Sequence, residues 1–171
     1  MNEVRTMTRD DIGAVAAIRV SGWRAAYAGI VPQPYLDAMD AEADAERRRG
    51  WFDEGNGRVD NLVSAEGGEL TGWAALGPYR GEQDGGEVGE LYAIYVRPDH
   101  IGKGAGRALM AAVRARAAER GFRRLRLWVL ADNEPARRFY TRAGFGPDGT
   151  DQIEMYDDMP LKELRYAADL G

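Results

Sequence analysis

Residues 90–110 read ELYAIYVRPDHIGKGAGRALM, an apolar run followed by a glycine-rich loop and the start of a helix. Leu91 to Val96 are rich in aromatic and β-branched residues, which predicts a buried strand. Glycines then alternate at 102, 104 and 106, so no side chain covers the backbone N–H groups there. Because a bare helix N-terminus readily binds phosphate oxygens, the stretch predicts a phosphate-bearing ligand.

The composition is that of a soluble globular protein. The chain has 171 residues, of which 44% are apolar and 30% charged, and we expect a single domain over residues 1–171. A net charge of −5 argues against nucleic acid as a partner, because no basic excess neutralises phosphates. No apolar run approaches the ~20 residues that span a bilayer, so no membrane contact is expected. The absence of cysteine excludes disulfides and thiolate metal sites and fits a cytoplasmic protein.

Hydrophobic periodicity predicts an alternation of strands and helices. Strands are expected at 4–7, 58–66, 70–79, 87–96 and 124–130, with two more between 145 and 166. Helices are expected at 8–27, 34–53, from the glycines to Gly121, and at 134–143. An antiparallel hairpin thus precedes a βαβ unit. The fold class predicted is α/β (α+β), with a mixed, partly antiparallel sheet of six to seven strands flanked by helices.

Two common phosphate loops do not fit the glycine spacing. A Walker loop needs a Ser or Thr after its lysine, but Lys103 is followed by Gly104. A dinucleotide loop needs Gly-x-Gly-x-x-Gly directly at a strand end, whereas here the pattern ends at Arg107 and Arg97 to His100 intervene after the strand. A loop that wraps a diphosphate without metal, or a simple tight turn, remains.

A second segment, LWVLADNEPARRFYTRAGF at 127–145, follows the glycine helix. Asn133 and Tyr140 are seven residues apart, so they lie about two turns apart on one helix face. Taken singly, Asn133 reads as a helix cap and Tyr140 as a core aromatic. Together the two segments resemble the GCN5-related N-acetyltransferase (GNAT) family over about 87–145.

The resemblance implies an enzyme that moves an acetyl group from acetyl-coenzyme A to a primary amine of a small molecule or peptide, in a direct ternary complex. It implies that the glycine loop binds the coenzyme diphosphate through Gly102, Lys103, Gly104, Ala105, Gly106 and Arg107. The family has Gln or Arg where this chain has Ile101. It also implies that Asn133 and the backbone of Ile94, Tyr95 and Val96 bind the pantetheine arm. A homodimer is expected only by analogy with the family.

Two residues are candidates for proton transfer. The resemblance places the Tyr140 hydroxyl near the thioester sulfur, where a phenol of pKa about 10 can protonate a departing thiolate. Alignment on the glycines places Glu90 where the histone-acetylating branch has its catalytic glutamate. Glu90 is therefore either a base, acting directly or through water, or an exposed strand-end carboxylate. No metal is expected, since His100 is the only histidine and no carboxylates show ligand spacing.

Aromatic residues near both ends of the chain are candidates for the acceptor site. Trp23 and Tyr27 are four residues apart and share a helix face, where they line an acceptor pocket or pack in the core. The acidic stretch 152–159, read as a loop, includes Glu154 and Tyr156 and either attracts an ammonium group or is simply solvated. With Glu90, these are the candidate acceptor residues. The alternative function is a catalytically silent coenzyme A-binding module.

Overall fold

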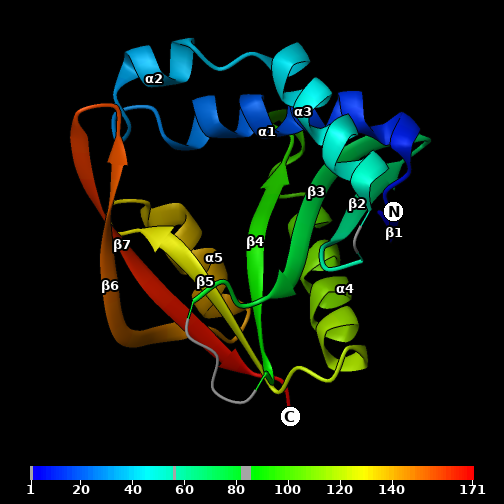
Figure 1. Cartoon of the computed structure of the whole chain (residues 1–171), viewed down its shortest axis with the longest axis vertical. Helices are drawn as coiled ribbons and strands as arrows, with labels where there is room; N and C mark the ends of the chain where they lie inside the picture. The colour runs from blue at the N-terminus through cyan, green and yellow to red at the C-terminus, as the bar shows by residue number, and fades with distance from the viewer. Residues whose placement is uncertain (1, 56, 82–85) are drawn as a thin grey trace.

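The computed structural model describes residues 2–55, 57–81 and 86–171. Within them seven strands form one sheet in the order β1-β2-β3-β4-β5-β7-β6 (Figure 1). The strands are Glu3–Thr6 (β1), Asp60–Glu66 (β2), Glu69–Pro78 (β3), Val88–Val96 (β4), Arg124–Leu130 (β5), Gly146–Tyr156 (β6) and Met159–Asp169 (β7). Neighbouring strands are antiparallel except β4 and β5, which are parallel. The predicted mixed sheet is confirmed.

Five α-helices lie in the described residues. They are Ile12–Ala26 (α1), Gln33–Asp37 (α2), Ala41–Glu54 (α3), Ala105–Glu119 (α4) and Glu134–Arg142 (α5). The prediction of one helix over 34–53 is wrong, because the Asp40 side chain accepts a hydrogen bond from the Glu42 N–H at 2.9 Å and starts a new helix. None of these helices is long and apolar enough to cross a membrane.

The stretch 152–159 is a β-hairpin and not the loop that the sequence suggested. Residues up to Tyr156 belong to β6, and Met159 begins β7, so the turn consists of Asp157 and Asp158. Side chains two residues apart on a strand point to the same face. Glu154 and Tyr156 therefore share one face of β6.

Helices cover both faces of the sheet, as alternating strand residues require. Leu62 of β2 joins Leu109 and Val113 of α4 in one core cluster. The next residue along β2, Val63, instead joins a second cluster with Ile12 of α1. Because adjacent strand residues point to opposite faces, α4 and α1 must lie on opposite sides of the sheet. Figure 1 shows α1 and α3 together above the strands, with α4 behind them.

The sheet opens at its centre, between β4 and β5. These strands pair only from Val88 to Glu90, against Arg124 to Arg126. Beyond Glu90 they diverge, as Figure 1 shows. An irregular pairing of β3 with β4, between Ala75 and Leu76, accompanies the divergence. The edge of β4 from Leu91 to Val96 therefore faces β5 without ladder hydrogen bonds to it.

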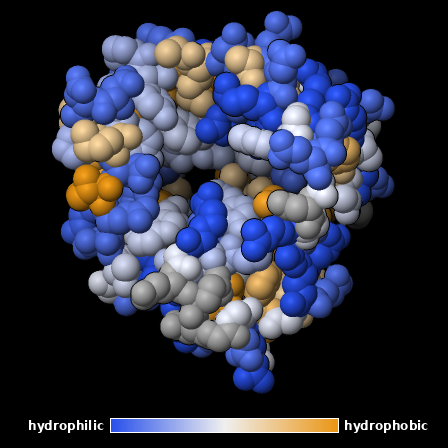
Figure 2. Space-filling view, in the orientation of Figure 1, coloured by the Kyte–Doolittle hydropathy of each residue, from blue (hydrophilic) through white to orange (hydrophobic). Residues whose placement is uncertain are grey.

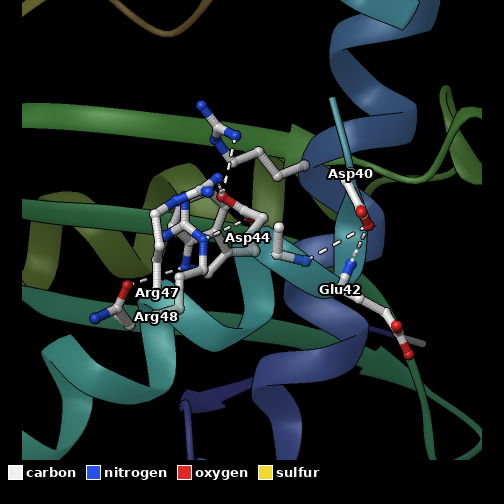
Figure 3. A network of polar contacts seen from close by, with 9 residues as sticks. Asp40, Glu42, Asp44, Arg47 and Arg48 are labelled. Atoms are coloured by element: carbon white, nitrogen blue, oxygen red, sulfur yellow. Dashed lines mark hydrogen bonds and ion pairs between the residues drawn. The ribbon is translucent and has the colours of Figure 1, made fainter. Parts of the chain in front are cut away.

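Asp44 of α3 is buried and forms ion pairs with three arginines (Figure 3). Its Oδ1 accepts hydrogen bonds from Arg19 of α1 at 3.2 Å and from Arg47 at 3.3 Å. Its Oδ2 accepts one from Arg48 at 2.9 Å, and that guanidinium also lies 4.5 Å from the centre of the Trp73 ring. This network joins α3 to α1 and to the sheet.

We expect Asp44→Asn to lower the free energy of unfolding by about 3 kcal/mol, because it removes the one carboxylate that serves three guanidinium groups. Urea unfolding measures the loss. The control is Asp53→Asn on the same helix, whose pair with Arg9 is more than half exposed and should contribute little to stability. Equal losses in the two variants would contradict the structural role of Asp44.

Candidate active site

Two cavities meet in the opening between β4 and β5. The first, here called the α5 cavity, has a volume of about 380 Å³ and is lined by Ile94 to Val96, Asn133 and Tyr140. The second, the α1 cavity, has a volume of about 480 Å³ and is lined by Trp23, Tyr27, Glu90, Glu163 and Tyr156 among others. Five residues line both cavities, namely Tyr27, Leu91, Tyr92, Tyr95 and Trp128. The two cavities therefore adjoin, and Figure 2 shows this face of the molecule hollowed near its centre.

The glycine loop presents backbone donors at the start of α4. Gly102 and Gly104 have φ of +83° and +92°, a conformation that favours glycine. Among the N–H groups of residues 102–107, only that of Lys103 donates to a carbonyl of the described chain, His100 O at 3.4 Å. The other donors, including those of Ala105 and Arg107 in the first helical turn, remain available for an anion.

The third glycine of the loop, Gly106, is explained by close packing and not by its backbone conformation. A Cβ at Gly106 would lie 3.1 Å from Cε1 of Phe139 and 3.7 Å from Cγ2 of Val96, so this glycine lets α4 approach α5 and β4 closely. A Cβ at Gly102 would meet nothing within 4 Å. Ile101, which stands where the family has Gln or Arg, is 66% exposed and lines the α5 cavity. It offers an apolar contact there in place of a hydrogen bond.

Asn133 and Tyr140 both line the α5 cavity. Asn133 is buried, and its Oδ1 accepts a hydrogen bond from the Ala136 N–H at 3.3 Å, so it caps α5. Its Nδ2 group has no partner among the described residues and stays free to donate. The Tyr140 ring packs edge-on against Phe145 and Tyr166. Its hydroxyl likewise has no hydrogen-bond partner within the described residues.

Burial raises the pKa of the Tyr140 phenol above its ordinary value, and the neighbouring Tyr95 adds to the effect. Burial likewise raises the pKa of Tyr27, of Tyr95 and of Tyr156. All four phenols therefore stay protonated near neutral pH, so they are hydrogen-bond donors and not bases. Among the described residues that line the α1 cavity, the carboxylates are then the side chains placed to accept a proton from an incoming ammonium group.

Glu90 is 2% exposed, so it is not the exposed strand-end carboxylate that the sequence left open. Its Oε2 accepts a hydrogen bond from Arg80 Nη2 at 2.7 Å, and its Oε1 accepts one from the Arg80 backbone N–H at 3.0 Å. The carboxylate lines the α1 cavity with Arg80 beside it. This ion pair could not be predicted from the sequence, because it depends on how the end of β3 lies against β4.

Aromatic side chains from distant segments line or back the α1 cavity. Trp23 lies edge-on to Tyr27 at 4.7 Å between ring centres, and it also lies 6.1 Å from Tyr156. The hydroxyls of Tyr27 and Tyr95 are 3.2 Å apart and share a hydrogen bond. Trp23 and Tyr27 therefore both line the cavity and pack against neighbouring side chains, so the two alternatives for them both apply. Trp128 also lines the cavity and was not among the predicted site residues.

Glu163 is a further cavity residue that sequence reasoning missed. Its Oε1 accepts a hydrogen bond from Gln152 Nε2 at 2.7 Å, and its Oε2 accepts one from the Tyr156 hydroxyl at 2.9 Å. Gln152 lies directly opposite Glu163 in the β6–β7 pairing. Recognising the turn at 157–158 would have paired these residues. Among the described residues, no group of three or more His, Cys, Asp or Glu side chains is placed to hold a metal ion.

Comparison with known proteins identifies a family and several relatives. A model of the acetyltransferase (GNAT) family matches residues 22–145. The N-acetyltransferase YuaI of Bacillus subtilis is 34% identical over 140 residues, which cover 82% of this chain and 78% of YuaI. A mycothiol acetyltransferase of Amycolatopsis mediterranei is 39% identical over 122 residues, which cover 70% of this chain but 38% of that protein. The chain thus spans well under half of that longer relative.

Solved structures share the fold. A PaiA N-acetyltransferase from Thermoplasma acidophilum, in complex with coenzyme A, has a TM-score of 0.80 at 19% identity and covers 99% of each chain. A ribosomal-protein-alanine N-acetyltransferase from Brucella melitensis has a TM-score of 0.77 at 26% identity and covers 98% of this chain and 99% of that one. The first likeness, at such low identity, concerns the fold alone.

Proposed function

Since this chain belongs to the GNAT acetyltransferase family, we propose that it transfers an acetyl group from acetyl-coenzyme A to a primary amine in a ternary complex. The observation that carries the proposal is that the α5 cavity and the α1 cavity adjoin and share five lining residues. A thioester in one cavity and an amine in the other would meet at the shared residues. We take residues 1–171 as one such domain, because all seven strands belong to one sheet.

The residues of the α5 cavity suit a long, polar, anionic ligand. The free N–H groups of the glycine loop would bind the diphosphate. The edge of β4 from Ile94 to Val96 would pair with the amides of the pantetheine arm, and the Nδ2 of Asn133 would donate to one of its carbonyls. When bound, acetyl-coenzyme A supplies the activated acyl group as a thioester.

Tyr140 would stabilise the departing thiolate. Its phenol has a raised pKa, whereas a thiol has a pKa of about 8.5, so complete proton transfer from the phenol to the departing thiolate is unfavourable. Tyr140 would therefore donate a hydrogen bond that strengthens as negative charge develops on sulfur. This assigns it a role as donor in the transition state.

Glu90 would accept the proton that the attacking amine loses, directly or through water. It lines the α1 cavity close to residues that both cavities share, such as Leu91 and Tyr92. Its contacts with Arg80 fix the carboxylate and leave a lone pair on Oε2, since each oxygen offers about two acceptor sites and Oε1 already accepts two hydrogen bonds from Arg80. A chain of water in the α1 cavity would then connect the amine to Glu90.

We expect Glu90→Gln to lower kcat by ~10²-fold near neutral pH, and the loss to shrink at high pH as the amine deprotonates without help. Steady-state kinetics from pH 6 to 10 measure the profile. Arg80→Gln is the matched control, because it removes the ion pair and keeps the carboxylate. A loss in Glu90→Gln that is the same at every pH would show that the residue does not act as a base.

A thiol-release assay with acetyl-coenzyme A over a panel of amines tests the proposed function. Amine-dependent release of coenzyme A, with one acetylated amine per thiol, is the expected result. One relative is named for mycothiol and another for ribosomal-protein alanine, so the panel should include small-molecule amines and peptides. Coenzyme binding without thiol release across the panel would instead indicate a silent coenzyme A-binding module.

A further inference from the structure

We infer that Glu163 is a specificity residue of the α1 cavity and selects an acceptor with a second cationic group, such as an aliphatic diamine. The inference rests on the proposed function, because it concerns the far end of the acceptor. The reactive amine would lie where the two cavities join, and the second cation would lie at the β6–β7 hairpin, which carries Glu163.

The charges of the α1 cavity do not cancel. Among the described residues that line it, the carboxylates are those of Glu90, Glu154 and Glu163, and the opposite charge is that of Arg80. Arg80 forms an ion pair with Glu90 at 2.7 Å. Within the described residues, neither Glu154 nor Glu163 forms an ion pair. The part of the cavity near the hairpin therefore has an excess of negative charge, which favours a cationic ligand group.

Glu163 is held in position by neutral donors. The Gln152 amide and the Tyr156 hydroxyl donate to its two oxygens at 2.7 and 2.9 Å. Burial, and next the charge of Glu163, raise the pKa of Tyr156, so this hydroxyl remains a donor. Neutral donors orient a carboxylate without supplying opposite charge. Each oxygen keeps a lone pair for a ligand, so the site is pre-organised for an ammonium group.

Aromatic rings complete the walls around this carboxylate. Tyr156 and Trp128 line the cavity with Glu163, and aromatic faces attract ammonium groups. A carboxylate beside such rings binds alkylammonium groups better than it binds hydroxyls, because the methylene groups next to the nitrogen also gain apolar contact. The volume of about 480 Å³ suits a small molecule.

The test compares four small amines as acceptors at saturating acetyl-coenzyme A. They are 1,4-diaminobutane, n-butylamine, 4-aminobutyrate and glucosamine, which differ in the charge or polarity of the far end. We expect kcat/KM for the diamine to exceed that for n-butylamine by ~10-fold or more, beyond the advantage of two equivalent amino groups. A preference for glucosamine or for 4-aminobutyrate would overturn the inference.

The variants locate the preference. Glu163→Gln should reduce the ratio of diamine to monoamine kcat/KM by ~10-fold. Glu154 is exposed, and its side chain forms no hydrogen bond with the described residues. Glu154→Gln should therefore reduce the ratio by a smaller factor without affecting folding. Glu46→Gln on α3 removes the same charge outside the cavity and should leave the ratio unchanged. A ratio that is unchanged in Glu163→Gln would overturn the inference, whatever the result in Glu154→Gln.

A binding measurement separates this inference from the proposed function. Titration calorimetry of 1,4-diaminobutane and n-butylamine, with coenzyme A present, reports the cation site without chemistry. Diamine binding that depends on Glu163, in a protein that releases no thiol, would overturn acetyl transfer and support the cation site. Acetyl transfer with equal binding of the two amines would support transfer and overturn the cation site.

Discussion

Gly104→Glu is expected to weaken coenzyme A binding by ~10²-fold or more, because the new carboxylate would compete with the diphosphate for the same N–H groups. Gly104 precedes the first turn of α4 directly, and a Cβ there would point into open space, with its nearest contact Asn2 Nδ2 at 3.9 Å. The side chain is therefore accommodated, and its charge lies over the free amides. Titration calorimetry with coenzyme A measures the affinity.

The control for this variant is Gly121→Glu at the other end of α4. Gly121 has φ of +86°, close to the +92° of Gly104, and a Cβ there meets nothing within 4 Å. Both variants should therefore lose on the order of 1–3 kcal/mol of stability from the strained backbone. Coenzyme affinity should fall only in Gly104→Glu. Normal affinity in that variant would contradict the assignment of the glycine loop.

Local signals account for much of what could be predicted. The strand before the glycine loop, the helix after it and the strand at 124–130 depend on residues close in sequence, and the structure has all three. Asp40 also carried a local signal, since an Asp followed by helical residues is a typical N-cap. The prediction of one helix over 34–53 nevertheless missed the break between α2 and α3, because the charged residues that follow Asp40 continue a helical pattern. Glycine spacing indicated backbone exposure at 102 and 104, whereas Gly106 depends on contact with Phe139, distant in sequence.

Long-range pairing determines the parts that were missed. Arg126 alternates with Leu125 and Leu127 along the strand, yet it is buried and its guanidinium lies 4.9 Å from the centre of the Tyr79 ring. The contact of Glu163 with Tyr156 depends on the register of the last hairpin. The partner of Arg126 cannot be identified from neighbouring residues, whereas the contact of Glu163 follows once the turn at 157–158 is recognised. The chemistry of the α1 cavity is thus set by tertiary contacts.

Tyr140→Phe is expected to lower kcat by ~10²-fold or more with little change in coenzyme affinity. The phenol hydroxyl has no hydrogen-bond partner among the described residues, so its removal leaves no protein group unpaired. The ring keeps its edge-on contacts with Phe145 and Tyr166. Only the donor to the departing thiolate is lost. Because the pKa of Tyr140 is raised, ionisation of this phenol should cause no loss of wild-type kcat below pH ~10.

Tyr166→Phe is the matched control for that prediction. Tyr166 lies 6.4 Å from Tyr140 between ring centres, and its hydroxyl accepts a hydrogen bond from Arg137 Nε at 2.9 Å. Its loss should lower the melting temperature and leave kcat within a few-fold of the wild type, since Tyr166 does not line the α5 cavity. Equal reductions of kcat in the two variants would mean that ring packing around α5 matters, and that the Tyr140 hydroxyl donates nothing to the leaving group. A reduction confined to Tyr140→Phe, with stability unchanged, follows only if the hydroxyl acts on the sulfur.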